Sequence, residues 1–171
     1  METTHKKSVV VIGGGTGTYT LLTGLKKYAD TIDIKAVISM ADSGGSSGRL
    51  RDEFGYLPVG DVRSALTALA RETGERNDVL RKLFLYRFDK GEGLTGHTFG
   101  NLFLVALTDI LGSEAKAIEA AGKVLATCGE VVPVTEDDTH LVAEFSTGEV
   151  LTNEHDIDLG DLVPLDARVT K

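Results

Sequence analysis

Hydrophobic and polar positions follow two different periods along the first forty residues. Residues 8–12 read Ser-Val-Val-Val-Ile, and this β-branched run predicts a strand buried on both faces, as in a parallel sheet. Residues 18–28 predict a helix with one apolar stripe, formed by Leu21, Leu22, Leu25 and Tyr28. A second strand is predicted over residues 34–40. A strand, a helix and a strand at this spacing predict a parallel βαβ unit.

The middle of the chain alternates predicted helices with glycine-rich connections. Residues 42–60 combine five glycines with serines and arginines, and they are predicted to form a long functional loop. Helices are predicted over residues 61–73, 78–88, 101–111 and 113–128. The third of these is apolar on nearly all sides, so it is expected to be central and buried.

The pattern changes after residue 129. Short strands are predicted over residues 131–135 and 140–145, and residues 149–151 are expected to pair back as a hairpin. The whole chain, residues 1–171, is predicted to be one α/β domain with a Rossmann-like three-layer sandwich and a mainly parallel sheet. Because a doubly wound fold needs about six strands, the sheet is expected to be incomplete at its C-terminal side.

Composition and charge narrow the class of protein. The net charge is −8 and no basic cluster is present, so nucleic acid is not an expected partner. The longest apolar run, residues 102–107, is too short to insert into a membrane, and no signal peptide is found, so a cytoplasmic location is expected. The lone Cys128 excludes an internal disulfide and is expected to be buried on a helix. The sequence leaves homo-oligomer formation open.

A glycine-rich turn follows the first predicted strand and carries the first candidate site. Its members are Gly13, Gly14, Gly15, Thr16, Gly17 and Thr18. Backbone amides at the start of a helix bind phosphate groups, and the threonine hydroxyls add donors. A tight turn without a ligand is the alternative. The third glycine of the dinucleotide fingerprint is replaced by Thr18 or Thr20, which disfavours a nicotinamide-dependent oxidoreductase.

The second glycine-rich stretch is more specific. Asp42 follows the second predicted strand, where a carboxylate can hold Mg²⁺ together with phosphates. Ser46 and Ser47 are hydrogen-bond donors, and Arg49 or Arg51 can bind an anion with two parallel bonds. A solvated serine-glycine linker is the alternative.

Two predicted helix starts complete the candidate set. Asp61 is either a helix cap or a ligand, and Arg63 opposes the helix dipole unless an anion lies nearby. His97 and Asn101 stand at the start of the apolar helix, where capping and ligand binding are equally open.

These motifs together resemble the gluconeogenesis factor family of bacteria, which is related to the 2-phospho-L-lactate transferases. The resemblance rests on residues 10–17, 41–54, 57–63, 83–88, 96–102 and 131–135, in family order. Many members carry a second aspartate where this chain has Ser43. Members are also longer, so the chain resembles their N-terminal half, and the remaining part would complete the sheet and supply much of the pocket.

The resemblance implies a nucleotide ligand. In the gluconeogenesis factor branch it implies a UDP-sugar-binding regulator of carbon metabolism and cell shape, and this chain leans toward that branch. The alternative is an enzyme similar to the transferases, which use Mg²⁺ to move a phospholactyl-type group from a nucleoside diphosphate to a flavin-like acceptor. In that branch a guanosine nucleotide would be the ligand.

Overall fold

A parallel sheet and six α-helices form the body of the molecule. The computed structural model describes residues 6–42, 44–72, 74–152, 156–157 and 167–171. The helices are α1 (Gly15–Leu25), α2 (Gly45–Phe54), α3 (Gly60–Leu69), α4 (Glu75–Leu85), α5 (Phe99–Leu111) and α6 (Glu114–Val124), with a 3-10 turn η1 (Lys26–Tyr28). The strands are β1 (Lys7–Gly13), β2 (Ile32–Ile38), β3 (Glu130–Pro133), β4 (Ala143–Glu144) and β5 (Val150–Leu151). The α/β class is confirmed.

The main sheet has the order β1-β2-β3, and both of its strand pairs are parallel. Val11 lies beside Ala36, and Ile38 lies beside Pro133. The strand predicted over residues 131–135 is expected to group with the late antiparallel strands, and this is wrong because β3 pairs parallel with β2. The helices between β2 and β3 return the chain to the starting end of the sheet, which a parallel connection requires. The predicted antiparallel hairpin is confirmed in β4 and β5.

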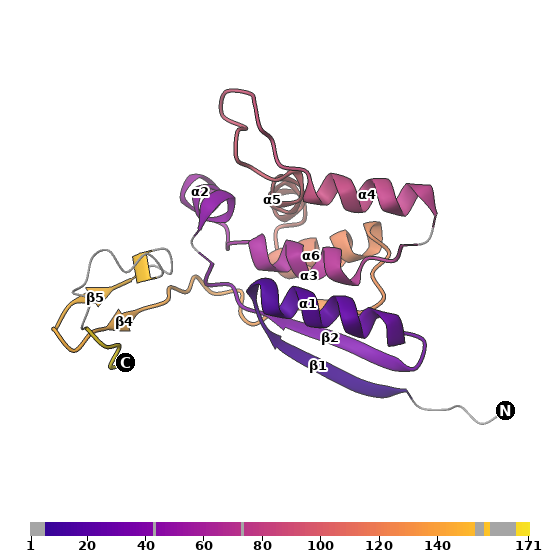
Figure 1. Cartoon of the computed structure of the whole chain (residues 1–171). Coiled ribbons are helices and arrows are strands. Elements are labelled where there is room, and N and C mark those ends of the chain that lie inside the picture. Colours follow the sequence, from indigo (N-terminus) through magenta and orange to yellow (C-terminus); the bar gives the residue numbers. More distant parts are fainter. Residues whose placement is uncertain (1–5, 43, 73, 153–155, 158–166) are drawn as a thin grey trace.

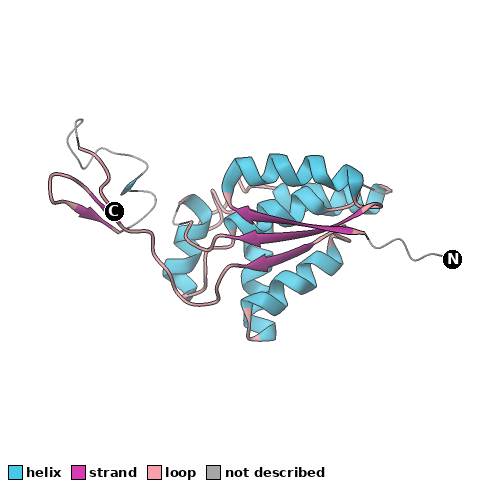
Figure 2. Ribbon diagram, turned by 90° about the horizontal axis from the view of Figure 1, so that it is seen from below, coloured by secondary structure: helices cyan, strands magenta, loops and turns pink. Residues whose placement is uncertain are grey.

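The layers are stacked in the order sheet, helices, helices (Figure 1). Helices α1, α3 and α6 lie on the sheet, and α2, α4 and α5 lie beyond them. Figure 2 looks onto the opposite face, where the strands lie in front of the helices. There Val10 is 55% exposed and Ile12 is 76% exposed. Burial of β1 on both faces is therefore wrong for the described chain, because a β-branched run does not reveal whether a second layer is present.

The core lies between the sheet and the first helical layer. It includes Leu22 from α1, Ile34 and Ile38 from β2, Leu66 from α3 and Ile118 from α6. A second apolar contact joins α4 to α5, where the Phe84 ring meets the Phe103 ring at a centroid distance of 5.0 Å.

Helix α5 is half-buried, which corrects the expectation of a central helix. Leu104 and Val105 face the interior, but Ile110 is 75% exposed because α5 lies in the outer layer. Helix α6 ends at Val124, so Cys128 follows the helix, and its backbone N–H donates to the Leu69 carbonyl. No described helix is both long enough and apolar enough to span a bilayer.

Helix α2 stands where the sequence predicts a loop over residues 42–60. Its last six residues contain no glycine and favour a helix, and Leu50 is buried. Gly55 ends it with φ of +73°, and the Gly55 N–H donates to the Arg51 carbonyl over 2.8 Å. The high glycine content hides a short helix between two glycine boundaries.

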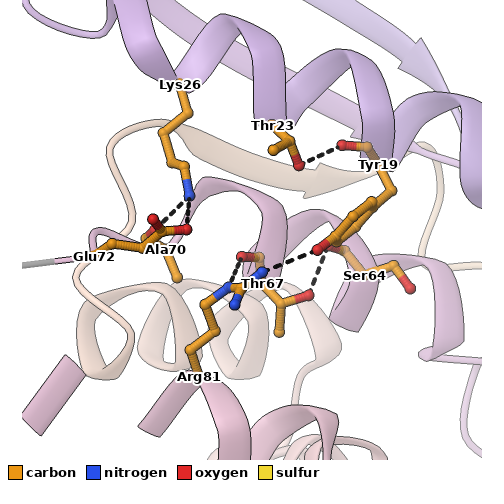
Figure 3. A network of polar contacts seen from close by, with 8 residues as sticks. All are labelled: Tyr19, Thr23, Lys26, Ser64, Thr67, Ala70, Glu72 and Arg81. Carbon is orange, nitrogen blue, oxygen red and sulfur yellow. Dashed lines mark hydrogen bonds and ion pairs between the residues drawn. The ribbon is translucent and has the colours of Figure 1, made fainter. Parts of the chain in front are cut away.

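A polar network fixes α1, α3 and α4 relative to one another (Figure 3). Arg81 of α4 donates to the Tyr19 hydroxyl of α1 over 3.1 Å and to the Thr67 carbonyl of α3 over 3.4 Å. Lys26 donates to the Ala70 carbonyl and forms an ion pair with Glu72. Since successive turns of α1 meet successive turns of α3, the two helices run parallel and begin side by side.

The packing predicts unequal effects of truncating two adjacent leucines in α1. Leu22→Ala should lower the free energy of unfolding by about 2–5 kcal/mol, because a fully buried leucine leaves a cavity. Leu21→Ala is the matched control, and with Leu21 52% exposed it should change stability by about 0.5 kcal/mol or less. Urea unfolding of the three proteins measures both effects. Equal losses would contradict the described packing of α1.

Candidate functional site

Four helices begin at the carboxyl-terminal end of the parallel strands. Ser39 marks this end of the sheet, since its backbone N–H donates to the Gly13 carbonyl over 3.0 Å. The first residues of α1 and α3 meet where Gly14 contacts Asp61, and those of α3 and α2 meet where Gly60 contacts Ser47. Helix α5 joins them through Asn101. The positive ends of four helix dipoles and their unsatisfied amide groups therefore face one region.

Two cavities open in this region and share one wall. The first has a volume of about 390 Å³ and is lined by Gly14, Gly15, Ser39, Asp42 and Asp61. The second has a volume of about 270 Å³ and is lined by residues of α2, α3 and α5 and by Arg87. Asp42 and Asp61 line both, so the two carboxylates stand between a glycine side and an arginine side.

Asp61 caps a helix other than its own. Val59 is the N-cap of α3, so the prediction that Asp61 caps this helix is wrong. Instead, the Asp61 carboxylate accepts a hydrogen bond from the Gly15 N–H at the start of α1. A Cβ atom on Gly14 would overlap this carboxylate, so glycine is required there. One of the amides expected to bind phosphate is therefore already used by the protein itself.

Burial and a second carboxylate both disfavour the charged form of Asp61. Burial raises the pKa of Asp61 above 3.8, the Gly15 hydrogen bond lowers it, and the charge of Asp42 raises it further. Asp42 Oδ1 accepts from the Gly44 N–H over 2.9 Å, while Oδ2 faces Gly60. Position 43 lies outside the described residues. The carboxylate beside Asp42 thus comes from Asp61, on a different element.

A buried hydrogen-bond chain connects α3, α5 and α2. Arg63 Nε donates to Asn101 Oδ1 over 2.8 Å, and Asn101 Nδ2 donates to Ser46 Oγ over 3.1 Å and to Ser47 Oγ over 3.4 Å. Ser46 Oγ lies 3.1 Å from His97 Nδ1. Ser46 accepts from Asn101 and keeps one proton that it can donate to His97 Nδ1, while its second lone pair can accept from a protonated Nδ1.

The surroundings of His97 favour the neutral form of the ring. Burial lowers the pKa of His97, and the nearby charges of Arg49 and Arg87 lower it further. The ring is buried and does not line either cavity. Thr98 is the N-cap of α5 and accepts from the Asn101 N–H, so a capping role for His97 or Asn101 is wrong. Both residues instead hold the serines of α2 in place.

Arg87 is the functional residue that sequence reasoning missed. It lies in a bend between α4 and α5, where Arg87 pairs with Thr98 and Arg87 Nη1 donates to the Gly96 carbonyl over 2.6 Å. Its guanidinium group lines the second cavity beside Arg63. Burial lowers the pKa of Arg63, and the charge of Arg87 lowers it further. Arg87 belongs to the 83–88 motif, but that motif does not indicate where the Arg87 side chain points.

The other candidates lie around the cavities rather than in them. Arg49 Nη2 donates to the Thr95 carbonyl over 3.1 Å, and Arg49 does not line the second cavity. Arg51 lines neither cavity, and its Nη1 atom is buried without a hydrogen-bond partner in the described chain. Thr16, Gly17 and Thr18 form the first turn of α1 next to the first cavity, and Gly13 ends β1. Ser39 and Ser64 are further lining residues.

Comparison with known proteins identifies the family. The family model described as 2-phospho-L-lactate transferase CofD matches residues 9–169. The chain belongs to the CofD family. A relative from Nostoc sp. is 53% identical over 149 residues, covering 87% of this chain and 31% of the relative. The gluconeogenesis factor of Bacillus subtilis is 42% identical over 153 residues, covering 90% of this chain and 46% of that protein.

A crystal structure of a similar protein has the same fold. The UPF0052 family protein of Bacillus halodurans superimposes with a TM-score of 0.86 at 40% sequence identity. The match covers 98% of this chain and 50% of that protein. The chain therefore spans a third to a half of the length of these CofD family relatives, which agrees with a sheet that is open at both edges in its described part.

The raised pKa of Asp61 predicts a specific pH dependence of stability. A carboxyl group whose folded pKa lies above its unfolded pKa destabilises the fold above the folded pKa, and this cost disappears as pH falls toward 3.8. Asp61→Asn removes the charge but keeps an acceptor for the Gly15 N–H. Without divalent cations, the variant should be the more stable protein at pH 7, and the difference should shrink as pH falls.

Urea unfolding at several pH values measures this difference. Asp78→Asn is the matched control, since it removes one carboxylate of α4 that lines neither cavity. A difference between wild type and Asp61→Asn that grows on acidification would show that the folded pKa of Asp61 is lowered rather than raised.

Proposed function

We propose that the chain binds the diphosphate group of a nucleotide, of the UDP-sugar type, and acts as a regulator of the gluconeogenesis factor kind. The observation that carries this proposal is the meeting of four helix N-termini around two carboxylates and two arginines. Helix N-termini and serine hydroxyls favour phosphate oxygens. A regulatory role in carbon metabolism and cell shape rests on the relatives named gluconeogenesis factor and on the family resemblance.

The first turn of α1 is the proposed phosphate-binding surface. The Gly15 amide is held by Asp61, which leaves the amides of Thr16 and Gly17 as donors in this turn. Gly17 has open space where a Cβ atom would be, so a ligand can approach its backbone closely. Ser46 and Ser47 stand on the other side of Asp42, from which the hydroxyl of Ser47 can reach a phosphate oxygen.

Asp42 and Asp61 fit a divalent cation such as Mg²⁺. Their mutual repulsion and the burial of Asp61 are costs that a bound cation would remove. Within the described residues, no group of three His, Cys, Asp or Glu side chains could hold a metal. The protein would therefore offer two carboxylates, and ligand phosphates would complete the shell, which is the usual arrangement for Mg²⁺.

The same geometry also supports an alternative function, a transferase of the phospholactyl type. The family model carries the transferase description, and a cation between two carboxylates would neutralise the donor's diphosphate and stabilise the nucleoside monophosphate that leaves when the phospholactyl group is transferred. Arg63 and Arg87 would then orient the transferred group. Turnover distinguishes the two functions, since a regulator binds the nucleotide and releases it unchanged.

Thermal unfolding with added nucleotides tests the proposal. UDP-glucose with Mg²⁺ should raise Tm, because a ligand at 100 times its Kd stabilises the folded state by about 2.7 kcal/mol. GDP and NADH are the comparison ligands for the transferase branch and for an oxidoreductase. A Tm that no nucleotide changes in a cooperatively folded sample would contradict nucleotide binding by this chain.

The cation requirement is predicted to depend on Asp42. Calorimetry should show that Mg²⁺ tightens UDP-glucose binding by about tenfold, equivalent to about 1.4 kcal/mol, in the wild-type chain. Asp42→Asn should bind with the affinity that the wild type has in EDTA, and added Mg²⁺ should leave it unchanged. Asp109→Asn, on α5 away from both cavities, is the control and should keep the Mg²⁺ effect.

A further inference from the structure

We propose that the shared end of α2 and α5 is a protein-interaction surface, and that it binds an arginine-bearing segment of a partner protein. The surface consists of Phe54, Tyr56, Asp109, Ile110 and Glu114. None of these residues lines either cavity of the candidate site. The inference therefore does not depend on the proposed function.

Two contacts hold α2 and α5 side by side in the same direction. Near their starts, Asn101 Nδ2 donates to Ser46 Oγ over 3.1 Å. Just past the end of α2, the Tyr56 hydroxyl donates to Asp109 Oδ1 over 3.0 Å. The rise of an α-helix puts Asp109 about 12 Å beyond Asn101 along α5. The surface thus lies at the opposite end of the helix pair from the candidate site.

Exposed aromatic and aliphatic side chains gather at this end. The rings of Phe54 and Tyr56 are nearly parallel, with an interplanar angle of 9° and a centroid distance of 6.4 Å. Phe54 is 52% exposed, and Ile110, which follows Asp109 on α5, is 75% exposed. Single exposed apolar residues are common on protein surfaces. Here the Tyr56 hydrogen bond to Asp109 brings the exposed residues of two helices to one place, which is typical of an interaction surface.

The charges beside the rings select the chemistry of the partner. The pKa of the Tyr56 hydroxyl is raised, first by its hydrogen bond to Asp109, then by burial and by the charges of Asp109 and Glu114. Neither carboxylate forms an ion pair within the parts of the chain that the structure describes. Arginine matches both features, because its planar guanidinium stacks on aromatic rings and donates two parallel hydrogen bonds to a carboxylate.

The position of the surface favours a separate partner over other occupants. Helices α2 and α5 lie in the outer helical layer, whereas the uncovered face with Val10 and Ile12 lies on the other side of the sheet (Figure 1). A further layer on that face would leave the ends of α2 and α5 accessible. The net charge of −8 disfavours a second copy, since two copies repel each other.

Two matched peptides test the inference on the full chain. One is a short peptide of arginine, leucine and glycine, and the other has lysine in place of every arginine. Fluorescence anisotropy of the labelled peptides should show that the wild type binds the arginine peptide about fivefold more tightly, because a guanidinium both stacks and forms paired hydrogen bonds. Equal affinities for the two peptides would overturn the proposal, since charge alone would then explain the binding.

Variants of the surface locate the binding. Phe54→Ala leaves the net charge unchanged and should remove the preference for arginine, whereas Phe54→Tyr keeps a ring and should retain it. Tyr28→Ala is the matched control, because it removes another ring that is 62% exposed, and it should bind as the wild type does. Urea unfolding should give Phe54→Ala the same midpoint as the wild type. A folded Phe54→Ala protein that still prefers arginine would contradict the inference.

The carboxylates and the second copy have their own tests. Asp109→Asn should weaken binding of both peptides by about threefold, and Asp78→Asn on α4 should leave it unchanged. Without peptide, the wild type and Phe54→Ala should sediment alike. A larger species that forms in the wild type and not in Phe54→Ala would show that a second copy occupies the surface, and this result would also overturn the proposal.

Discussion

The meeting of four helix N-termini is the constraint on which the rest of the site depends. The starts of α1, α2, α3 and α5 bring unsatisfied N–H groups and positive dipole ends to one edge of the sheet. Asp61 partly balances this by accepting from Gly15, and Asp42 does so by accepting from Gly44. The two carboxylates lie close together and repel each other, so they attract a cation. The neighbouring helix N-termini attract anions, and the site therefore combines both preferences.

The layer order explains how this edge is built. Helices α1 and α3 run parallel on one face of the sheet; Arg81 of α4 joins Tyr19 of α1 to Thr67 of α3, and Lys26 of η1 donates to the Ala70 carbonyl at the end of α3 (Figure 3). The helices of the outer layer then contribute further side chains to the site: Ser46 and Ser47 from α2, and Asn101 from α5. The opposite face of the sheet, with Val10 and Ile12, carries no helix in the described chain, and CofD family relatives are two to three times as long.

Electrostatics divides the site into two sides with different chemistry. Asp42 and Asp61 form a wall, with amide donors of α1 on one side and Arg63 and Arg87 on the other. A cation on the wall would lower the repulsion between the carboxylates and draw phosphates toward both sides. This arrangement serves a binding protein and a phosphoryl-type transferase equally well, since both need a neutralised diphosphate. The bonds from His97 and Asn101 to the serines keep the geometry fixed in either case.

Local sequence determined most of the elements and the family, and it named many of the residues that line the two cavities. Apolar periodicity located β1, β2 and α4 to within a few residues, and the motifs around Gly13, Asp42, Asp61 and Asn101 named the residues that meet. Tertiary structure decided what those patterns leave open. A β-branched run is the same whether one face of a strand is covered or both, and glycines that bound a helix resemble a loop. Asp61 caps α1 instead of α3, and Arg87 turns into the cavity, because partners distant in sequence fix where a side chain points.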